Sequence, residues 1–446
     1  MGRIAPLLAA SAAAVLAASA GAAHDARANG VNTHTWISFH AIEHLPDGEL
    51  KRLLSDPELA PMIINGSIFP DGGYAVDSPF GETAHWGPFH AAFLRWMQDN
   101  LPEPYARGEA RPYVAFLMGV ASHGMADQVF DSMFMEAARG YDAASWSDTL
   151  LDSFDTATDV MLVDSTQVDY RGTELWLPSM EMPGMFAEVG VSVDADTLLN
   201  AQSAMHNFIL AYGAVNGRDP QAVTRYRTQY PWASEHLMDP HEPGSPPCEG
   251  EVVAAYWLTL WDRLHGVDGP DNMIIATYPP DDSDGHPTDH TKVEAQSVVV
   301  FGHGIGSGVA DKLRITDSTG KTYGFTARPF YSEANAVAIR PTEDWAPNEI
   351  ITVSIAAGVQ TVDGFAYDAP FEYSFTTRPA SGPLDPTTDP TPHDGEPWTP
   401  PPGGGDSGGC DAGGGAGLGA ALALVAQRRR KKQQQQQQQQ TKKVPS

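Results

Sequence analysis

The chain has 446 residues, of which 42% are apolar, so it is long enough for two or three domains, and wholesale disorder is excluded. It carries 56 acidic against 27 basic residues and a formal net charge of −29. Because so acidic a surface repels polyanions, a nucleic-acid binder is disfavoured. The two cysteines, Cys248 and Cys410, do not predict a disulfide framework or a cysteine-based zinc site.

The first 28 residues have the pattern of a secretory signal peptide. Arg3 supplies a positive charge, residues 4–20 form an apolar stretch rich in Ala and Leu, and small residues suited to cleavage end at Ala22 and at Ala28. The apolar stretch is short for a lasting membrane anchor. We therefore predict export, with cleavage after Ala28 preferred, so that the mature chain begins at Asn29.

Residues 29–269 are predicted to form an all-α domain. Apolar residues recur at helical spacing in separate segments, and clusters of Pro and Gly divide these segments. The predicted helices cover residues 36–45, 86–97, 113–135, 146–163, 197–212 and 252–264. Segment 113–135 is almost continuously apolar, so we expect it to be the central buried helix. Residues 169–248 give no functional signal.

Three polar residues interrupt this central helix at a regular interval. His123, Asp127 and Asp131 follow one another four residues apart, which places their side chains along one stripe of the helix. Burying two carboxylates side by side is costly unless a cation neutralises them. The stripe therefore indicates either a metal site or a narrow solvent-exposed face, and the helix alone does not decide between them.

Further candidate ligands lie on other segments. Asp155 and Asp159 repeat the four-residue spacing on the next predicted helix, which is acidic throughout; the others are His34, Asp71 and His85. Taken singly, each would more often be a capping or otherwise satisfied polar residue. Together, His nitrogens and Asp oxygens suit zinc or a similar divalent ion. A carboxylate such as Asp127 can bridge two metal ions, a known way to bind a phosphodiester.

Residues 270–378 are predicted to form a small all-β sandwich. Short runs rich in β-branched residues, separated by turn sequences, cover residues 298–301, 313–315, 336–339, 350–355 and 371–375. The last part of this region resembles bacterial Ig-like domains of the surface-layer type. That resemblance implies a spacer or an adhesion module. We expect no catalytic group here, and we expect His303 and Asp311 to lie on the surface.

The C-terminal part has the composition of a linker and an anchor. Residues 379–409 are rich in Pro, Gly, Thr and Asp, which is typical of a spacer. Residues 410–432 contain a short apolar stretch followed by five basic residues, and they resemble myxobacterial-type C-terminal sorting tails. That resemblance implies processing at the cell surface. Residues 433–446 form a low-complexity tail.

The helical segments also resemble a known family. Gly30-Val-Asn-Thr-His34-Thr-Trp-Ile is similar to the N-terminal motif of bacterial zinc-dependent phospholipases C. Phe69-Pro-Asp71-x-x-Tyr74, Ala84-His85-Trp86 and Ser122-His123-x-x-x-Asp127 resemble the glycosylphosphatidylinositol-specific phospholipase D branch of that superfamily. The resemblance covers roughly residues 29–161. It implies a compact all-α domain with two or three zinc ions in a cleft.

The resemblance also implies roles for individual residues. His34 and Asp127 would serve one metal, and Asp71, His85, His123 and Asp127 a second, with Asp71 also acting as the catalytic base. The third family site uses two histidines and an acid, and its counterparts here are Asp131, Asp155 and Asp159. So oxygen-rich a site would suit Ca²⁺, Mg²⁺ or Mn²⁺, or it would hold no ion. The amino group of Asn29 would be close enough to reach a metal.

We therefore expect an exported, metal-dependent phosphodiesterase that acts on phospholipid or glycolipid head groups at a membrane surface, with sorting machinery as the partner of its C-terminus. C-type and D-type cleavage both remain open. One alternative is a non-catalytic surface adhesin whose metal only stabilises the fold. A single-strand-specific nuclease is disfavoured by the acidic charge and the lack of a basic groove.

Overall fold

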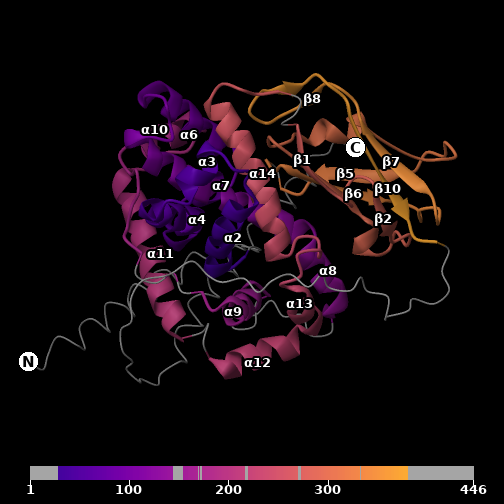
Figure 1. Cartoon of the computed structure of the whole chain (residues 1–446), viewed down its shortest axis with the longest axis horizontal. Coiled ribbons are helices and arrows are strands. Elements are labelled where there is room, and N and C mark those ends of the chain that lie inside the picture. The colour runs from indigo at the N-terminus through magenta and orange to yellow at the C-terminus, as the bar shows by residue number, and fades with distance from the viewer. Residues whose placement is uncertain are drawn as a thin grey trace, which may run out of the picture.

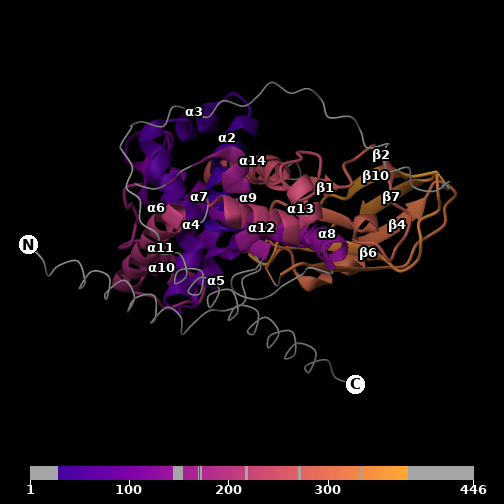
Figure 2. The same ribbon diagram turned by 90° about the horizontal axis from the view of Figure 1, so that it is seen from below.

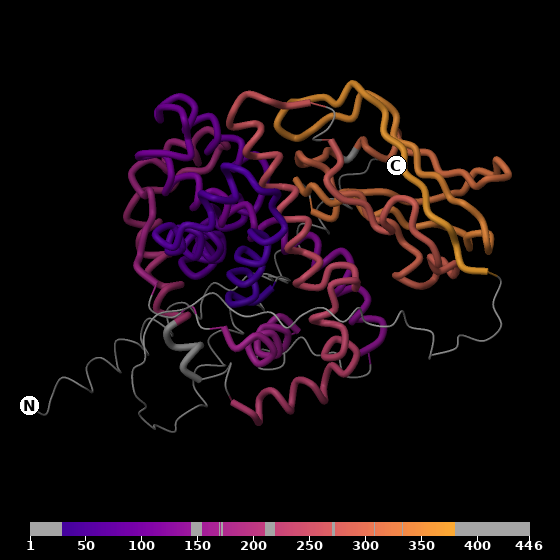
Figure 3. Tube along the Cα trace, in the orientation of Figure 1, coloured from indigo at the N-terminus to yellow at the C-terminus, as the bar shows by residue number. Residues whose placement is uncertain are grey.

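The computed structural model describes residues 29–143, 154–168, 170, 173–215, 219–269, 273–331 and 333–379. The predicted signal peptide 1–28, most of the linker, the predicted sorting segment 410–432 and the low-complexity tail lie outside these residues. A helical region and a β-sandwich lie side by side (Figure 1). The chain passes from one to the other once, after α14 (Figure 3). The predicted fold class, an all-α domain plus a small all-β sandwich, is confirmed.

The helical region surrounds one long central helix, α7, which packs against α2, α4, α6 and α14. The helices are α2 Val31–His44, α3 Glu49–Leu54, α4 Ala60–Ala75, α5 Phe80–Ala84, α6 Gly87–Asn100, α7 Arg111–Ser132, α8 Phe134–Tyr141, α9 Phe154–Thr166, α10 Met182–Glu188, α11 Ala195–Val215, α12 Pro220–Gln229, α13 Pro231–His236 and α14 Pro246–Leu264. None of the described helices is both long enough and apolar enough to cross a membrane.

The predicted central helix ends earlier than expected. Segment 113–135 was expected to be continuous, but α7 ends at Ser132, where Met133 leaves the helical region with φ −128° and ψ −73°. The chain resumes at once as α8. The start of the predicted helix 146–163 falls on residues that the structure does not describe, and its remainder is α9.

Helix α4 has no counterpart in the sequence pattern. It contains Pro70 and several glycines, which normally disfavour a helix interior. Tertiary packing overrides these preferences. A Cβ atom on Gly66 would lie 2.3 Å from the carbonyl oxygen of Phe116, so only glycine lets α4 approach α7 this closely. This approach brings Asp71 on α4 near the polar stripe of α7.

The β region is a sandwich of two four-stranded sheets. One sheet has the order β1-β3-β6-β5 and the other β2-β10-β7-β4; all pairs are antiparallel except β2 with β10. The strands are β1 Ile274–Tyr278, β2 Ser283–His286, β3 Ser297–Phe301, β4 Leu313–Asp317, β5 Phe325–Pro329, β6 Ala336–Pro341, β7 Ile350–Ile355, β8 Val359–Gln360, β9 Ala366–Tyr367 and β10 Phe371–Thr377. The five predicted strands correspond to β3, β4, β6, β7 and β10.

The helical region and the sandwich are joined by a shared hydrophobic core. Val298, Val300 and Ala336 of the first sheet belong to the same cluster of buried residues as the helical core. Helix α14 packs against β1 (Figure 2), and the contacts between elements also join α7 to β6. Because domains joined by an apolar interface do not move freely, the sandwich holds a fixed position relative to the helices.

A partly buried cluster of charged side chains links the helical region to the sandwich at one end of this interface. The prediction that His303 lies on the surface is wrong, since the residue is 2% exposed; Asp311 is exposed as expected. His303 bonds Asp363 through Nδ1 at 2.9 Å and Asp268 through Nε2 at 3.1 Å, and Arg263 contacts both carboxylates. Burial alone would lower the pKa of His303, but the hydrogen bonds to the two aspartates raise it above its ordinary value.

Replacing His303 with glutamine is expected to destabilise the protein in a pH-dependent way. A raised histidine pKa stabilises the folded chain below its ordinary value of about 6.5, and this stability is lost as the pH rises through the folded pKa. We expect H303Q to cost about 2 kcal/mol at pH 6, because charge-assisted hydrogen bonds disappear. The difference should shrink toward pH 9 in urea denaturation. The exposed pair His290–Asp344 is the control, and H290Q should cost no more than about 0.5 kcal/mol.

Candidate metal centre

The polar stripe of α7 is buried, which removes the solvent-face interpretation. His123 is 0% exposed, Asp127 3% and Asp131 1%, and every residue from Val114 to Ser132 is buried. An apolar helix that buries two carboxylates needs compensating positive charge or hydrogen-bond donors. The side chains that the neighbouring elements place against this stripe therefore determine whether it can bind a metal.

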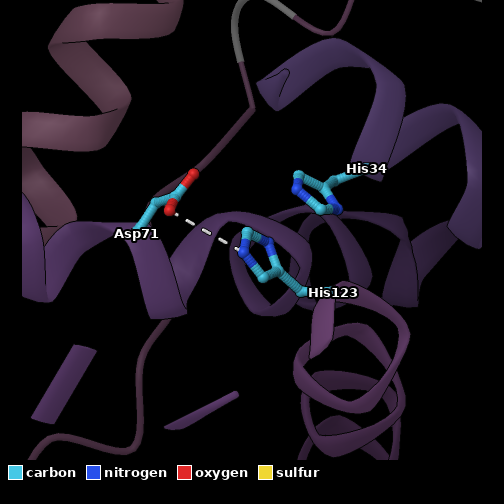
Figure 4. A group of neighbouring side chains, drawn as sticks. All are labelled: His34, Asp71 and His123. Carbon is cyan, nitrogen blue, oxygen red and sulfur yellow. Dashed lines mark ion pairs between the residues drawn. The ribbon is translucent and has the colours of Figure 1, made fainter. Parts of the chain in front are cut away.

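Three other elements bring ligand-type side chains to this stripe. His34 comes from α2, Asp71 from α4, and His85 from the position after α5. The nearest atom pairs around Asp127 are His34 Nε2 with Oδ1 at 3.1 Å, His85 Nε2 with Oδ2 at 3.4 Å and His123 Nε2 with Oδ2 at 3.5 Å. Asp71 Oδ1 lies 3.8 Å from His123 Nε2, and the His34 and His123 rings stack 3.6 Å apart (Figure 4). The structure thus brings five of the eight predicted ligands together.

A close backbone contact fixes the distance between His85 and His123. A Cβ atom on Gly124 would lie 1.9 Å from the carbonyl oxygen of His85, so no other residue fits without a shift of the backbone. As a result, the Nε2 atoms of His85 and His123 come within 3.1 Å of each other.

The hydrogen bonds of these two rings determine which nitrogen is free for a metal. His123 Nδ1 lies 2.6 Å from the carbonyl oxygen of Ser67, and His85 Nδ1 lies 2.6 Å from that of Gly81. A carbonyl oxygen only accepts, so both Nδ1 atoms carry hydrogen, and the Nε2 lone pairs of the neutral rings face each other. Metal-bound histidines have this arrangement, in which an outer carbonyl orients the ring and leaves the second nitrogen to the ion.

The electrostatics favour the protonation states that metal ligands need at Asp127 and His123, but not at His85. Burial works against ionisation of Asp127, but His34 and His123 outweigh it and lower its pKa. Burial, reinforced by His34, lowers the pKa of His123 well below its ordinary value. For His85, burial is outweighed by the hydrogen bond and charge of Asp127, so its pKa is raised. A metal binds the ionised form of a carboxylate and the neutral form of an imidazole. Because the pKa of His85 is raised, a metal would have to displace a proton from this ring.

Several buried polar atoms near this centre have no hydrogen bond of acceptable geometry among the described residues. They are Asn29 Oδ1, both ring nitrogens of His34, Asp127 Oδ1 and Glu249 Oε1. Unsatisfied buried acceptors are rare in native proteins, and a divalent cation satisfies them. The mixture of imidazole nitrogens and carboxylate oxygens is one that zinc accepts. The residues present therefore fit a zinc ion.

The remaining predicted ligands are not gathered into a site. Among the described residues, ligand atoms within 4.8 Å of one another form the groups His34–Asp71–His123 and His85–His123–Asp127, and an exposed third group on the sandwich, Asp289–His290–Asp344. No such group contains Asp131, Asp155 or Asp159. A third ion at these aspartates stays a prediction.

Asp159 instead holds the beginning of α2. Its Oδ1 accepts hydrogen bonds from the backbone nitrogen and hydroxyl of Thr33 at 2.8 and 2.9 Å, and its Oδ2 accepts one from Asn32 at 2.9 Å. Burial outweighs these bonds and raises the pKa of Asp159. A carboxylate at a helix N-terminus satisfies otherwise orphaned N–H groups. The adjacent His34 is thereby held in place.

Replacing Asp159 with alanine is expected to lower the free energy of unfolding by about 2–4 kcal/mol, because several buried bonds to a charged acceptor are lost. The folded variant should keep the zinc content of the wild type, measured by elemental analysis after buffer exchange. The control is Asp164, which lies on the same helix as Asp159 and forms a surface salt bridge with Arg227 of α12. D164A should lower the free energy of unfolding by no more than about 1 kcal/mol. Loss of one zinc per folded chain in D159A alone would instead support the prediction that Asp159 is a ligand.

Glu249 was not identified from the sequence, although it is a fully buried carboxylate that interacts electrostatically with Asp127. It is 0% exposed on α14, and its Oε2 accepts a hydrogen bond from Asn29 at 2.8 Å. Burial and the charges of Asp127 and Asp131 raise its pKa well above the ordinary value. The sequence does contain a pattern that predicts its burial. Glu249 precedes Val252, Val253 and Tyr256 by three, four and seven residues, so it lies on the same buried face of the helix.

Tyr331 was also not identified from the sequence, and it comes from the sandwich. Its hydroxyl donates to Asp131 Oδ2, and its ring lies 5.0 Å from that of Trp86, the neighbour of His85. No local pattern marks a tyrosine in a connection between two strands as part of a site on a helical region. Only the packing of the two regions reveals it.

Comparisons with known proteins match two parts of the chain to protein families. Residues 33–130 match the model of the zinc dependent phospholipase C family, and residues 272–377 match that of the bacterial Ig-like domain. The predicted relationship to the zinc phospholipase C/D superfamily and the predicted Ig-like domain are thereby confirmed; the sorting tail stays a prediction.

The similar curated proteins are phosphatidylinositol-glycan-specific phospholipases D. That of Bos taurus is 29% identical over 175 residues, which are 36% of this chain and 20% of the relative. That of Rattus norvegicus is 33% identical over 117 residues, 24% of this chain and 14% of the relative. That of Dictyostelium discoideum is 25% identical over 235 residues, 49% of this chain and 24% of the relative. The chain thus spans about a quarter or less of these relatives.

Proposed function

We propose that this chain, which joins a zinc phospholipase C-like helical region to a bacterial Ig-like domain, is an exported phosphodiesterase that hydrolyses phospholipid or glycolipid head groups. The observation that carries the proposal is the convergence of three histidines on the buried carboxylate of Asp127, with Asp71 alongside. The similarity to phosphatidylinositol-glycan-specific phospholipases D supports a head group linked through a phosphodiester.

Five residues of this centre would hold zinc, namely His34, Asp71, His85, His123 and Asp127. Bound zinc supplies Lewis acidity, which lowers the pKa of water toward about 7 and offsets phosphate charge. The carbonyl oxygens of Ser67 and Gly81 keep the His123 and His85 rings in the orientation that presents Nε2. This preorganisation avoids reorganising the ligands when substrate binds.

Asp71 is the residue best placed to act on water. Its side chain is 15% exposed, whereas those of His34 and His123 are fully buried and those of His85 and Asp127 are 4% and 5% exposed. A carboxylate at the open side of the centre can accept a hydrogen bond from water and orient it toward phosphorus. If Asp71 accepts the proton of that water, it acts as a general base.

Export is part of the proposal. The apolar stretch and small residues before Asn29, together with the bacterial Ig-like domain, are compatible with a protein that works outside the cell. Residues 410–432 would then hold it at the cell surface or direct its release. Cleavage after Ala28 would leave the new amino group on Asn29, whose side chain already contacts Glu249 beside the centre.

The function is tested by offering the zinc-loaded full chain vesicles of phosphatidylcholine, vesicles of phosphatidylinositol and a glycosylphosphatidylinositol-anchored protein. Phosphorus NMR of the products separates release of phosphorylated head group, the C-type outcome, from release of phosphatidic acid, the D-type outcome. We expect hydrolysis of at least one substrate that stops on chelation and returns with zinc. A zinc-loaded chain that hydrolyses none of them would favour the adhesin.

A further inference from the structure

The connection between β5 and β6 of the sandwich lies against the metal centre. Gln128, the residue after Asp127 on α7, is 2% exposed, and its Oε1 accepts hydrogen bonds from the backbone nitrogens of Asn335 and Ala336 at 2.6 and 2.8 Å. Buried side-chain bonds to two successive backbone groups leave little freedom of position. The connection is therefore fixed relative to the helix that carries His123 and Asp127.

Tyr331 in this connection contacts two residues that neighbour predicted ligands, Asp131 and Trp86. Its hydroxyl donates to Oδ2 of Asp131, one helical turn after Asp127, and its ring packs on Trp86 at 5.0 Å and 40°. Trp86 in turn donates to Glu82, which also accepts a hydrogen bond from Tyr74. The sandwich thus supplies one side chain to the aromatic and acidic surroundings of the ligand histidines.

Tyr74, which donates a hydrogen bond to Glu82, is also influenced by the charge of Asp127. Burial raises the pKa of Tyr74, and the charges of Glu82, Asp127 and Tyr331 raise it further. Asp131 itself acts on Glu249 together with Asp127. Asp131 lies one helical turn after Asp127 on the same buried stripe of α7, so a change in the orientation of its carboxylate would alter the field around Asp127.

We propose that Tyr331 is a positioning residue of the metal centre and that the Ig-like domain is a working part of the hydrolase rather than a spacer. The phenol fixes the carboxylate of Asp131, and the ring braces Trp86 beside His85. Partners that orient the groups around a metal commonly contribute a factor of about 10–100 to metal affinity or activity. The inference rests on the proposed function only for its kinetic measurement.

The test uses the full chain with Tyr331→Phe, which removes the hydroxyl and keeps the ring. Zinc affinity is measured by competition with a chromophoric chelator, kcat and KM with a soluble chromogenic phosphodiester, and folding by thermal unfolding. The control is Arg340→Ala, which removes an exposed salt bridge to Glu136 across the same interface. We expect Y331F to lose zinc affinity by about 10-fold or more and to lower kcat with little change in KM, whereas R340A changes neither.

A double-mutant cycle identifies the route of the effect. If Tyr331 acts through Asp131, adding Y331F to Asp131→Ala should lower zinc affinity no further. Zinc affinity and kcat within twofold of the wild type for folded Y331F would overturn the proposal, as would a wild-type chain that binds no zinc. Should the wild type bind zinc but hydrolyse nothing, the proposed function fails, while a 10-fold affinity loss in Y331F still supports the positioning role.

Discussion

Replacing Asp127 with asparagine is expected to reduce phosphodiester hydrolysis by roughly 10³-fold or more, because a metal supplies several kcal/mol of transition-state stabilisation. The carboxylate lies within 3.5 Å of His34, His85 and His123, so it contacts all three rings. Asparagine keeps the shape but removes the charge that offsets the ion. Initial rates with a chromogenic phosphodiester at saturating zinc measure the effect.

The matched control is Asp99→Asn on the exposed side of α6, which should leave the rate unchanged. The same preparations are compared by thermal unfolding, so that loss of activity is not confused with loss of structure. Folded D127N that retains more than a tenth of the wild-type rate would place the chemistry elsewhere in the chain.

Replacing Asp71 with asparagine is expected to lower kcat by about 10²–10⁴-fold, the usual contribution of general acid–base catalysis, with a smaller change in KM. Asp71 belongs to only one of the two ligand groups, so the other group, His85–His123–Asp127, stays intact and at least one zinc ion should stay bound. The acidic limb of the pH profile of kcat/KM should also change, since it reports an essential base. Loss of all zinc in D71N, or an unchanged kcat, would contradict the role of Asp71 as base.

The sequence predicted the elements whose pattern is local. Spacing of four residues on an apolar helix is a property of the helix alone, so His123, Asp127 and Asp131 could be assigned to one stripe before the fold was known. Helix α4 was missed because its glycines and Pro70 are unfavourable in isolation. They are tolerated only because α7 lies close enough to require Gly66.

The sequence also predicted all five residues of the centre, Asp127 and the four residues around it, and it grouped Asp159 with them as a further candidate ligand. Asp127 and Asp159 both occur at helical spacing in the sequence, and only their contacts in the fold differ. Asp159 accepts hydrogen bonds from Asn32 and Thr33, whereas Asp127 lies against histidine rings. Tyr331 and Glu249 depend on contacts between segments far apart in the chain. In so acidic a chain, charge alone could not identify the functional carboxylates.

The most direct test of the account is the zinc content of the full chain, purified without chelators and measured by native mass spectrometry and elemental analysis. We predict at least one tightly bound zinc per wild-type chain and none at this centre in folded His123→Ala, because that histidine belongs to both buried ligand groups. A wild-type chain that remains free of zinc at micromolar zinc, or a folded H123A that binds as much zinc as the wild type, would contradict the assignment of the metal centre.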